Sequence, residues 1–545
     1  MTLPSEELSV ATASASASDS RNAALSASPR LATTGTVDLA GLHSLPVWQQ
    51  NQVFADSEAE VAHAIVHDLA DNNPEMAARY GIRGWQKLAG LSSAAFGVIA
   101  ALLAPSVLLL ALLGITSGIV LITFILSVAG LLRSRAGSAR RQLVPELADE
   151  QLPTYTVLVP AYREEEVIGA MVKCLAKLDY PPQRLEVLLL VERGDIGTQR
   201  AIAAAGPPAY MRVLQVPSGP PRTKPRSCNA GLLVANGELL TIFDAEDRPE
   251  PDQLRRAAAV FAANSTDLAC VQAELRTGNE RTNLLTHCFG VEYALRSRLI
   301  LPGLVALGVP FPPCGTSNHF RTQVVRDVGG WDAWNVSEDA DLGMRLHALG
   351  YRMTTVDSVT FTDATDRLRD WIWQRTRWHK GYLLTALIHT RAPLDTVQRF
   401  GVRGLVGLMT VVLGTPLQFL VQPVISALGI SGSLGFRGLI HAVYADTNVI
   451  SAIQFATLLI WLIAAYLACV KPRRIHLLVV AALPVYWLAH WFAAWRALYQ
   501  LVTAPFVWEK TAHHANGATE SATVTASPGH CESTSRLTGI CGHGN

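Results

Sequence analysis

The sequence predicts an α/β domain with a mostly parallel sheet, embedded between transmembrane α-helical segments. Half of the 545 residues are hydrophobic and only 16% are charged. The mean hydropathy is +0.24, a balance typical of chains with several lipid-buried segments. Residues 150–392 differ from the rest, because short apolar strands alternate there with helical patterns, as in a parallel α/β sheet.

Charge and cysteine content exclude two other classes of protein. The formal net charge is +1, from 45 Lys and Arg against 44 Asp and Glu, so the chain lacks the cationic surplus that nucleic-acid binding needs. The eight cysteines include no Cys-x-x-Cys pair and no spacing typical of a zinc site. We therefore expect no nucleic-acid partner, and reduced thiols in a cytoplasmic domain.

The first membrane region is predicted at residues 88–133. Residues 88–132 contain no charged side chain. One crossing takes roughly 20 residues, so this stretch is more than twice as long as one crossing needs. Two helices that turn near Pro105 or Gly114 are therefore expected. Arginines and a lysine flank the stretch, which places both of its ends in the cytoplasm. Residues 1–87 are expected to form a disordered tail and short helices.

Residues 393–500 are predicted to form interfacial and transmembrane helices. Three apolar runs occupy this region: residues 404–436, 447–470 and 475–495. The basic residues 471–474 are expected on the cytoplasmic side, but the number of crossings and the side of the C-terminus stay open. Within residues 501–545, the mixed aromatic and basic stretch 506–513 predicts an interfacial helix, followed by a disordered tail.

Three buried strands are the clearest elements of the central domain: residues 156–160, 185–191 and 239–243. Each is followed by polar or acidic residues, at 162–166, 192–195 and 244–247. Ligands of open α/β sheets bind beyond the carboxyl ends of the strands. The three clusters should therefore converge on one crevice.

The third cluster contains three acids within four positions, Asp244, Glu246 and Asp247. Crowded carboxylates repel one another unless a cation is bound between them. Their hard oxygens suit Mg²⁺ or Mn²⁺, which can bridge the diphosphate of a nucleotide. An acidic run is more often a solvated turn or a helix cap, and only its place at a strand end favours the metal.

A second acidic cluster, Glu338, Asp339 and Asp341, opens a helical pattern. One interpretation makes Asp339 a general base that takes the proton of an attacking hydroxyl, with Asp341 as the next candidate. The other is an N-terminal helix cap, because the helix dipole favours acids there.

Gln374 and Arg377 lie at i and i+3, on one helix face, beside Trp378. A cationic fork next to an indole suits a diphosphate beside a stacked sugar. An interfacial helix with an aromatic and basic belt is the alternative, and both interpretations can apply to one helix.

The order of these motifs resembles the processive family 2 glycosyltransferases: cellulose, curdlan and hyaluronan synthases and their bacterial relatives. The motifs are VPAY at 159–162, an acidic residue after the second strand, Lys-Pro-x-x-x-Asn at 224–229, a D-x-D-like run at 244–247, Ser-Glu-Asp at 337–339 and Q-x-x-R-W at 374–378. The resemblance covers about residues 150–385, and the flanking membrane segments are similar too. It implies an A-type nucleotide-sugar transferase fold, a UDP-sugar donor and an inverting single displacement.

The resemblance also implies roles for individual residues. The donor would be bound by Tyr162, Glu192, Lys224, Asp244, Gln374, Arg377 and Trp378. The metal would be held by Asp244 with Glu246 or Asp247. Asp339 would be the catalytic base, and the acceptor would contact Trp378 and Gly315, where a glycine allows a sugar to approach closely.

The sequence departs from the family pattern in three places. Glu192 stands where an Asp is usual, with Asp195 three residues on, so which of the two meets the nucleotide stays open. The metal motif is Asp-Ala-Glu-Asp instead of Asp-x-Asp, and Ser337 replaces the commoner Thr.

Together these observations predict a metal-dependent, membrane-integrated hexosyltransferase that elongates a β-linked polysaccharide and exports it. UDP-glucose is the expected donor. The expected partners are the growing glycan, the bilayer and accessory export proteins. The expected location is multi-pass in the plasma membrane, with the catalytic domain in the cytoplasm.

Two alternatives remain. A non-processive transferase that glycosylates a membrane lipid is disfavoured by Q-x-x-R-W, which simple lipid transferases generally lack. A nucleotide-sugar sensor without activity is disfavoured by the intact carboxylates of Asp244, Asp247 and Asp339. The sugar, the linkage, processivity and the oligomeric state stay open.

Overall fold

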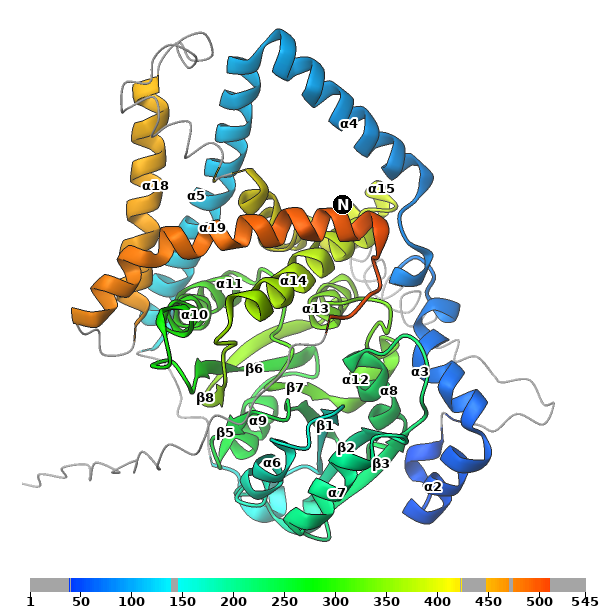
Figure 1. Ribbon diagram of the computed structural model, residues 1–545. Coiled ribbons are helices and arrows are strands. Elements are labelled where there is room, and N and C mark those ends of the chain that lie inside the picture. Colours follow the sequence, from blue (N-terminus) through cyan, green and yellow to red (C-terminus); the bar gives the residue numbers. More distant parts are fainter. Residues whose placement is uncertain are drawn as a thin grey trace, which may run out of the picture. The chain divides into compact units, whose positions relative to one another are not determined.

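The computed structural model describes residues 39, 41–138, 146–421, 423, 447–469 and 474–509. The expected N-terminal and C-terminal tails and most of the basic residues 471–474 lie outside these residues. Figure 1 shows the central sheet with helices on both faces and long apolar helices beyond one end of the domain.

The sheet has eight strands in the order β3-β2-β1-β4-β7-β6-β8-β5. The strands are β1 (Tyr155–Ala161), β2 (Leu185–Glu192), β3 (Met211–Val216), β4 (Leu239–Ile242), β5 (Arg248–Pro249), β6 (Leu268–Thr277), β7 (Asn318–Arg321) and β8 (Arg352–Thr362). The pairs β1–β2, β1–β4, β2–β3 and β6–β8 are parallel, whereas β7 and β5 pair antiparallel with their neighbours. The predicted fold class, a mostly parallel α/β sheet with apolar helices around it, is confirmed.

The three predicted strands are β1, β2 and β4. Nearly every residue of β1 and β2 is buried, because helices cover both faces of this half of the sheet. Strands covered on both faces read as continuous hydrophobic runs in a sequence.

Two helical layers cover the sheet. One consists of α6 (Ile168–Leu175), α7 (Ile196–Ala205) and α9 (Gln253–Ala262). The other consists of α2 (Val47–Asp56), α3 (Glu58–Asn72), α8 (Lys224–Val234), α12 (Thr322–Asp327) and α13 (Glu338–Ala348). The short N-terminal helices therefore belong to the domain core, and the Asn229 side chain ties α8 to α3 through the carbonyl of Ile65, at 2.9 Å.

Helices α4 (Gly84–Leu103) and α5 (Pro105–Ser138) cover the residues for which two membrane helices were predicted. The break between them falls at Ala104, directly before Pro105 and not at Gly114. Proline lacks the N–H that a helix interior needs and disfavours helical geometry in the preceding residue. Among the described residues, four helices are long and apolar enough to cross a membrane: Gly84–Leu103, Pro105–Leu132, Pro393–Val421 and Arg474–Thr503.

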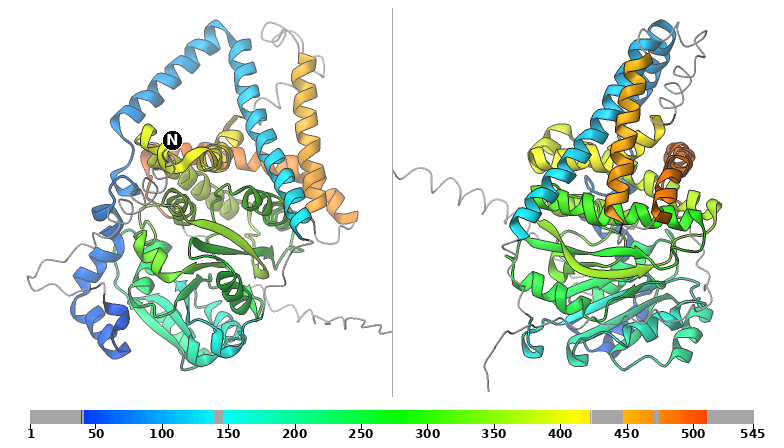
Figure 2. Two further views of the ribbon diagram at one scale, coloured as in Figure 1. Left: turned by 180° about the vertical axis from the view of Figure 1, so that it is seen from behind. Right: turned by 90° about the vertical axis from the view of Figure 1, so that its left-hand side faces the viewer.

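The helices that join the sheet to the apolar helices are α10 (Leu284–Leu295), α11 (Leu301–Leu307), α14 (Leu368–His389) and α15 (Pro393–Val406). The remaining apolar helices are α18 (Thr447–Ala468) and α19 (Arg474–Thr503). In both Figure 1 and Figure 2, α19 runs across α5 and α18. It lies alongside α14, to which its side chains hydrogen-bond.

Residues 504–509 after α19 are not helical. The predicted interfacial helix at 506–513 is therefore wrong in its described part, and residues 510–513 lie outside the described residues. The buried Lys380 ammonium of α14 donates hydrogen bonds to the carbonyls of Ala504 and Val507, at 3.0 and 2.9 Å. These bonds replace helical ones and fold the segment back onto the domain.

Gly303 is where α11 crosses α5 with direct backbone contact, so we expect Gly303→Val to destabilise the protein. A Cβ at Gly303 would lie 2.5 Å from Ser127 Cα, and one at Gly130 would lie 2.0 Å from the Gly303 carbonyl oxygen. Backbone cannot yield as a side chain does, so overpacking here should cost about 3 kcal/mol or more. Thermal unfolding in detergent measures the loss. Gly118→Val, where nothing lies within 4 Å, is the control and should melt as the wild type does; equal melting of both variants would contradict this crossing.

Candidate active site

A cavity of about 630 Å³ opens at the carboxyl ends of β1, β2 and β4. Tyr162, Glu192 and Asp244, one from each predicted cluster, line it. The three clusters therefore meet at one site, as their positions after the strands predict. On the other side the cavity reaches residues of the apolar helices, among them Thr123 and Trp461.

Lys224 joins three of the sequence motifs. It begins α8, its ammonium pairs with the Asp244 carboxylate, and it donates a hydrogen bond of 2.7 Å to the Gly315 carbonyl. Burial alone would lower the pKa of Lys224, but the adjacent Asp244 carboxylate outweighs burial and raises it. Lys224 is therefore a permanent positive charge in the cavity.

The three acids after β4 have different surroundings. Asp244 and Glu246 line the cavity, whereas Asp247 does not. The Asp247 carboxylate is 1% exposed and accepts hydrogen bonds from the Asp244 N–H, at 2.8 Å, and from the Thr316 hydroxyl. Asp247 therefore shapes the turn, which is the alternative use of an acidic run.

Asp244 and Glu246 fit a divalent cation. Among the described residues no group of three or more His, Cys, Asp or Glu side chains is arranged as a metal site. Mg²⁺, however, is usually bound through only one or two carboxylates, with substrate phosphates and water completing its shell. Burial, followed by the nearby charges of Asp244 and Glu164, raises the pKa of Glu246, and a bound cation would act in the opposite direction.

Glu192 and Asp195 have separate surroundings. Glu192 lines the cavity and accepts a hydrogen bond of 3.0 Å from the buried Arg226 guanidinium. Asp195 caps α7, where its carboxylate accepts bonds from the Thr198 N–H and hydroxyl, at 3.2 and 2.8 Å. Of these two acids, only Glu192 lines the cavity.

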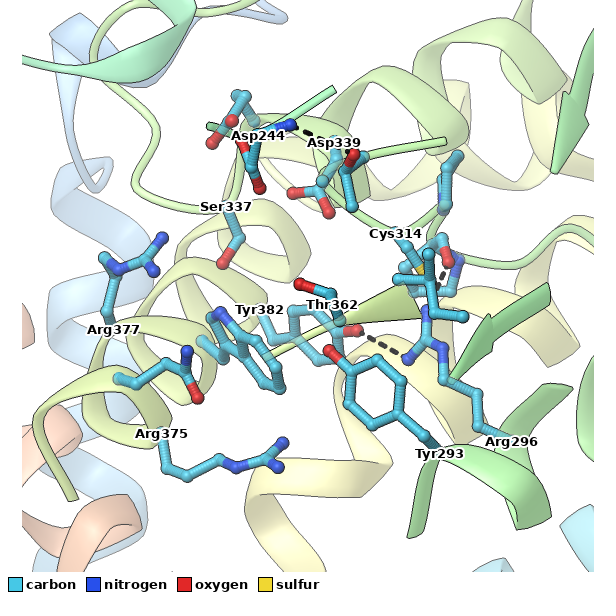
Figure 3. Close-up of a pocket in the computed structure, with 18 of the residues that line it drawn as sticks. Asp244, Tyr293, Arg296, Cys314, Ser337, Asp339, Thr362, Arg375, Arg377 and Tyr382 are labelled. Atoms are coloured by element: carbon cyan, nitrogen blue, oxygen red, sulfur yellow. Dashed lines mark hydrogen bonds between the residues drawn. The ribbon is translucent and has the colours of Figure 1, made fainter. Parts of the chain in front are cut away.

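Asp339 lies at the second position of α13 and faces the cavity. Figure 3 shows it beside Asp244, with Tyr382 and Arg296 further along the cavity. Burial raises the pKa of Asp339, while the charges of Lys224 and Arg296 act in the opposite direction. A partly desolvated carboxylate with a raised pKa has the character of a general base.

Asp341, the second candidate for the base, is committed elsewhere. It is fully buried, and its carboxylate accepts bonds from Arg345 Nε at 2.7 Å and from His389 Nε2 at 3.1 Å. It does not line the cavity. Its role is to join α13 to the end of α14.

Gln374, Arg377 and Trp378 all face the cavity from α14. Gln374 Oε1 and Arg377 Nε are buried without a hydrogen-bond partner in the part of the chain that the structure describes. Arg375, between them, also lines the cavity, where it pairs with Glu292 at 3.0 and 2.8 Å. Buried groups without partners are costly, so this wall is suited to a polar, anionic ligand.

Residues 153–381 match the family described as "Glycosyltransferase like family 2". This segment is a family 2 glycosyltransferase domain. The match confirms the predicted family for these residues and does not distinguish processive from non-processive members.

Three relatives align with this domain. The "Probable glycosyltransferase YdaM" of Bacillus subtilis is 26% identical over 240 residues, which are 43% of this chain and 56% of that protein. "Beta-monoglucosyldiacylglycerol synthase" of Synechocystis is 28% identical over 237 residues, 42% of this chain and 48% of that protein. "Probable glucomannan 4-beta-mannosyltransferase 15" of Arabidopsis thaliana is 25% identical over 245 residues, 43% and 45%. The chain spans about half the length of these relatives.

The glycosyltransferase domain has cavity residues that the sequence analysis missed. They are Arg222, Tyr293 and Arg296 and, from outside residues 153–381, Tyr382 and Trp508. Arg296 lies in a π-helical turn after α10 and donates a 2.6 Å bond to the Pro312 carbonyl. Such a turn has no sequence signature. Trp508 was predicted to lie at the membrane interface because its neighbours are aromatic and basic.

Trp508→Ala is expected to weaken UDP binding to the glycosyltransferase domain about tenfold. The Arg377 guanidinium lies 4.3 Å from the centre of the Trp508 ring, and a desolvated cation–π contact is worth about 1–2 kcal/mol. Without the indole, Arg377 is no longer held toward the cavity. Calorimetric titration with UDP measures the effect. Trp508→Phe, which keeps an aromatic face, should recover most of the affinity; equal binding by all three proteins would contradict this role.

Proposed function

We propose that this chain is a membrane-held, inverting hexosyltransferase that uses a UDP-sugar and Mg²⁺ or Mn²⁺. One observation supports this most directly: Asp339 faces the same cavity as Lys224 and Arg377. A base for an acceptor hydroxyl and cations for a diphosphate are the two parts that such a transfer needs. The family 2 domain over residues 153–381 supports the same reaction class.

In the proposed step the acceptor hydroxyl oxygen forms a bond to C1 of the donor sugar. The bond from C1 to the diphosphate oxygen breaks, and the nucleoside diphosphate leaves with the electron pair. Asp339 takes the hydroxyl proton, while Lys224 and Arg377 bind the diphosphate. Tyr162, Glu192, Gln374 and Trp378 line the cavity and are the proposed contacts to nucleotide and sugar. A divalent cation at Asp244 and Glu246 would offset the charge of the leaving group.

The acceptor that we propose first is the hydroxyl of a membrane lipid. The part of the cavity next to the apolar helices includes the side chains of Leu295, Ile300, Leu301, Leu304 and Val411. These residues would accommodate an acyl chain while the lipid hydroxyl reaches Asp339. The relative named as a monoglucosyldiacylglycerol synthase supports this acceptor.

Elongation of a β-linked polysaccharide from UDP-glucose is the second candidate. The same part of the cavity also contains polar and aromatic side chains, namely Thr123, Thr410, Thr415, Gln418 and Trp461. Hydroxyls, amides and indole faces suit a glycan that passes between helices. The relative named as a glucomannan mannosyltransferase supports this candidate, and the Gly315 loop beside Asp339 would contact the acceptor sugar.

One experiment tests the proposal and separates the two acceptors. Purified full-length protein in nanodiscs is incubated with radiolabelled UDP-glucose or another nucleotide sugar, with Mg²⁺ or Mn²⁺, and the product is extracted into organic solvent. Label in the organic phase supports a lipid acceptor. Label in an insoluble or aqueous polymer that a specific glucanase degrades supports elongation. No transfer from any nucleotide sugar, with UDP binding intact, would contradict the proposed enzyme.

We also propose that the protein lies in the plasma membrane with this domain on the cytoplasmic side. The basic residues around the α4–α5 pair support that orientation. A cysteine at the exposed Gly197 should react with an impermeant maleimide only after cells are permeabilised. A cysteine at Ala104, in the turn between α4 and α5, should react in intact cells. The reverse labelling pattern would overturn the orientation.

A further inference from the structure

One loop of the glycosyltransferase domain leads directly to the proposed base. This α12–α13 loop comprises residues 328–337, from the end of α12 to the start of α13, and Asp339 is the second residue of α13. The Ala333 carbonyl of the loop accepts a 3.0 Å hydrogen bond from the hydroxyl of Thr223, which directly precedes Lys224 at the start of α8. The loop is therefore joined to the two helices that bear Asp339 and Lys224.

Helix α3 and the short helix η2 (Ala78–Tyr80) contact this loop from outside the glycosyltransferase domain. The Asp332 carboxylate of the loop accepts a 2.5 Å hydrogen bond from the Ala78 N–H of η2. A Cβ at Gly329 would lie 2.8 Å from the Leu69 side chain of α3, so the backbone of the loop lies close against that helix. The N-terminal helices therefore support the α12–α13 loop.

Helix η2 is in turn held from the end of α14. The buried Arg391 guanidinium donates hydrogen bonds to the carbonyls of Ala77 and Gly81, at 2.9 and 2.6 Å, and these two residues flank η2. Arg391 follows α14, the helix that bears Arg377. The N-terminal helices are therefore fixed relative to the helix that forms one wall of the cavity.

Trp334 connects the α12–α13 loop with both α3 and the segment after α19. Its ring stacks on His67 of α3, with the ring centres 5.8 Å apart, and meets Phe506 edge-on at 5.4 Å. Phe506 comes two residues before Trp508, whose ring lies 4.3 Å from the Arg377 guanidinium. A single side chain thus lies between α3 and the segment that reaches the cavity.

We infer that α3 is a positioning element for sugar transfer, and that Trp334 is the residue through which it places Asp339 and the Trp508 segment. The inference rests on the proposed function, because it concerns the place of the proposed base. Trp334 comes five residues before Asp339, and a displacement of about 1 Å at a reacting group can cost about 10² in rate. An aromatic pair is worth about a two- to tenfold change in an equilibrium, so the contact with His67 should contribute a smaller part.

Transfer rates per UDP-binding site test the inference in the full-length protein in nanodiscs. Calorimetric titration with UDP gives the number of sites and the affinity, and single-turnover transfer gives the rate. We expect Trp334→Ala to lower the rate per site about 10²-fold and the UDP affinity about two- to tenfold. Trp334→Phe keeps an aromatic ring and should stay within about threefold of the wild type. A variant that is only less stable loses sites but keeps the rate per site.

Trp48→Ala is the matched control, because Trp48 lies on the N-terminal helix α2 and is 64% exposed. It removes the same side chain and should transfer sugar and bind UDP as the wild type does. An unchanged rate per site in Trp334→Ala, or an equal loss in Trp48→Ala, would overturn the inference. If Trp334→Ala bound no UDP, the comparison of His67→Ala with Trp48→Ala would decide in its place.

His67→Ala tests the route from α3. It should slow transfer per site about two- to tenfold, and the double variant with Trp334→Ala should be no slower than Trp334→Ala alone, because His67 acts through Trp334. Losses that multiply in the double variant would show independent roles and overturn the route. If the wild type transferred no sugar, the proposed function would fail. The inference would then be decided by UDP affinity, which Trp334→Ala should weaken and Trp48→Ala should not.

Discussion

Asp339→Asn is expected to bind UDP within about twofold of the wild type and to transfer sugar about 10²–10⁴ times more slowly. An acceptor hydroxyl is a poor nucleophile until its proton is removed, and that factor is the usual contribution of a general base. Asparagine keeps the size and the hydrogen-bonding capacity of the side chain but accepts no proton. UDP affinity should persist, because the diphosphate contacts are assigned to Lys224 and Arg377, which the substitution leaves in place.

Single-turnover kinetics and calorimetric titration with UDP measure the two quantities for Asp339→Asn. Asp341→Asn is the informative comparison, because it alters the neighbouring acid in the same helix. It breaks a buried pair with Arg345 and His389, so it should lower the melting temperature, a loss of about 3–5 kcal/mol, whereas Asp339→Asn should not. If Asp339→Asn retained more than about a tenth of the wild-type rate, Asp339 would not be the base.

The parallel half of the sheet was predictable from sequence, and the other half was not. Strands β1, β2 and β4 are continuous apolar runs, because helices bury both of their faces. Strand β8 alternates buried, half-buried and exposed residues, and β7 has only four residues, Asn-His-Phe-Arg. Such segments become strands through pairing with distant neighbours, and tertiary context outweighs their own propensity.

The motifs predicted which segments line the cavity, but they did not predict which of the neighbouring acids face it. Asp244 and Asp247 are three residues apart, yet one faces the cavity and the other turns back to Thr316. Asp195 likewise caps α7 while Glu192 stays at the cavity. These choices depend on backbone direction at a turn. Sequence spacing alone does not give that direction.

Contacts between residues far apart in the chain could not be predicted from the sequence either. Trp508 comes more than a hundred residues after Arg377, and the two meet only because α19 lies along α14. Aromatic and basic residues are typical of a membrane interface and of a phosphate site alike. The composition of residues 506–513 therefore did not reveal the contact of Trp508 with Arg377 in the cavity.

Removal of divalent cations is expected to abolish transfer by the wild type, and added Mn²⁺ or Mg²⁺ should restore it. A cation that offsets the charge of a leaving diphosphate is worth several kcal/mol in the transition state, which corresponds to about 10²–10⁴ in rate. Chelation followed by titration with Mn²⁺ measures the loss and the recovery. Full activity in excess EDTA would exclude the proposed metal and leave Lys224 and Arg377 as the only charges assigned to the diphosphate.

We expect Asp244→Asn to lose sugar transfer as the chelated wild type does, and added metal should not restore the activity of this variant. The carboxylate is the proposed ligand and also the partner of Lys224, so the variant should lose about 10² or more in rate at saturating Mn²⁺. Asp247→Asn is the matched control. It removes the same charge three residues further along the chain, from a side chain that does not face the cavity. It loses the carboxylate that accepts the Thr316 hydroxyl and the Asp244 N–H, so it should melt at a lower temperature yet respond to Mn²⁺ as the wild type does. If the two variants exchanged these phenotypes, Asp247 would be the metal ligand and Asp244 the residue that shapes the turn.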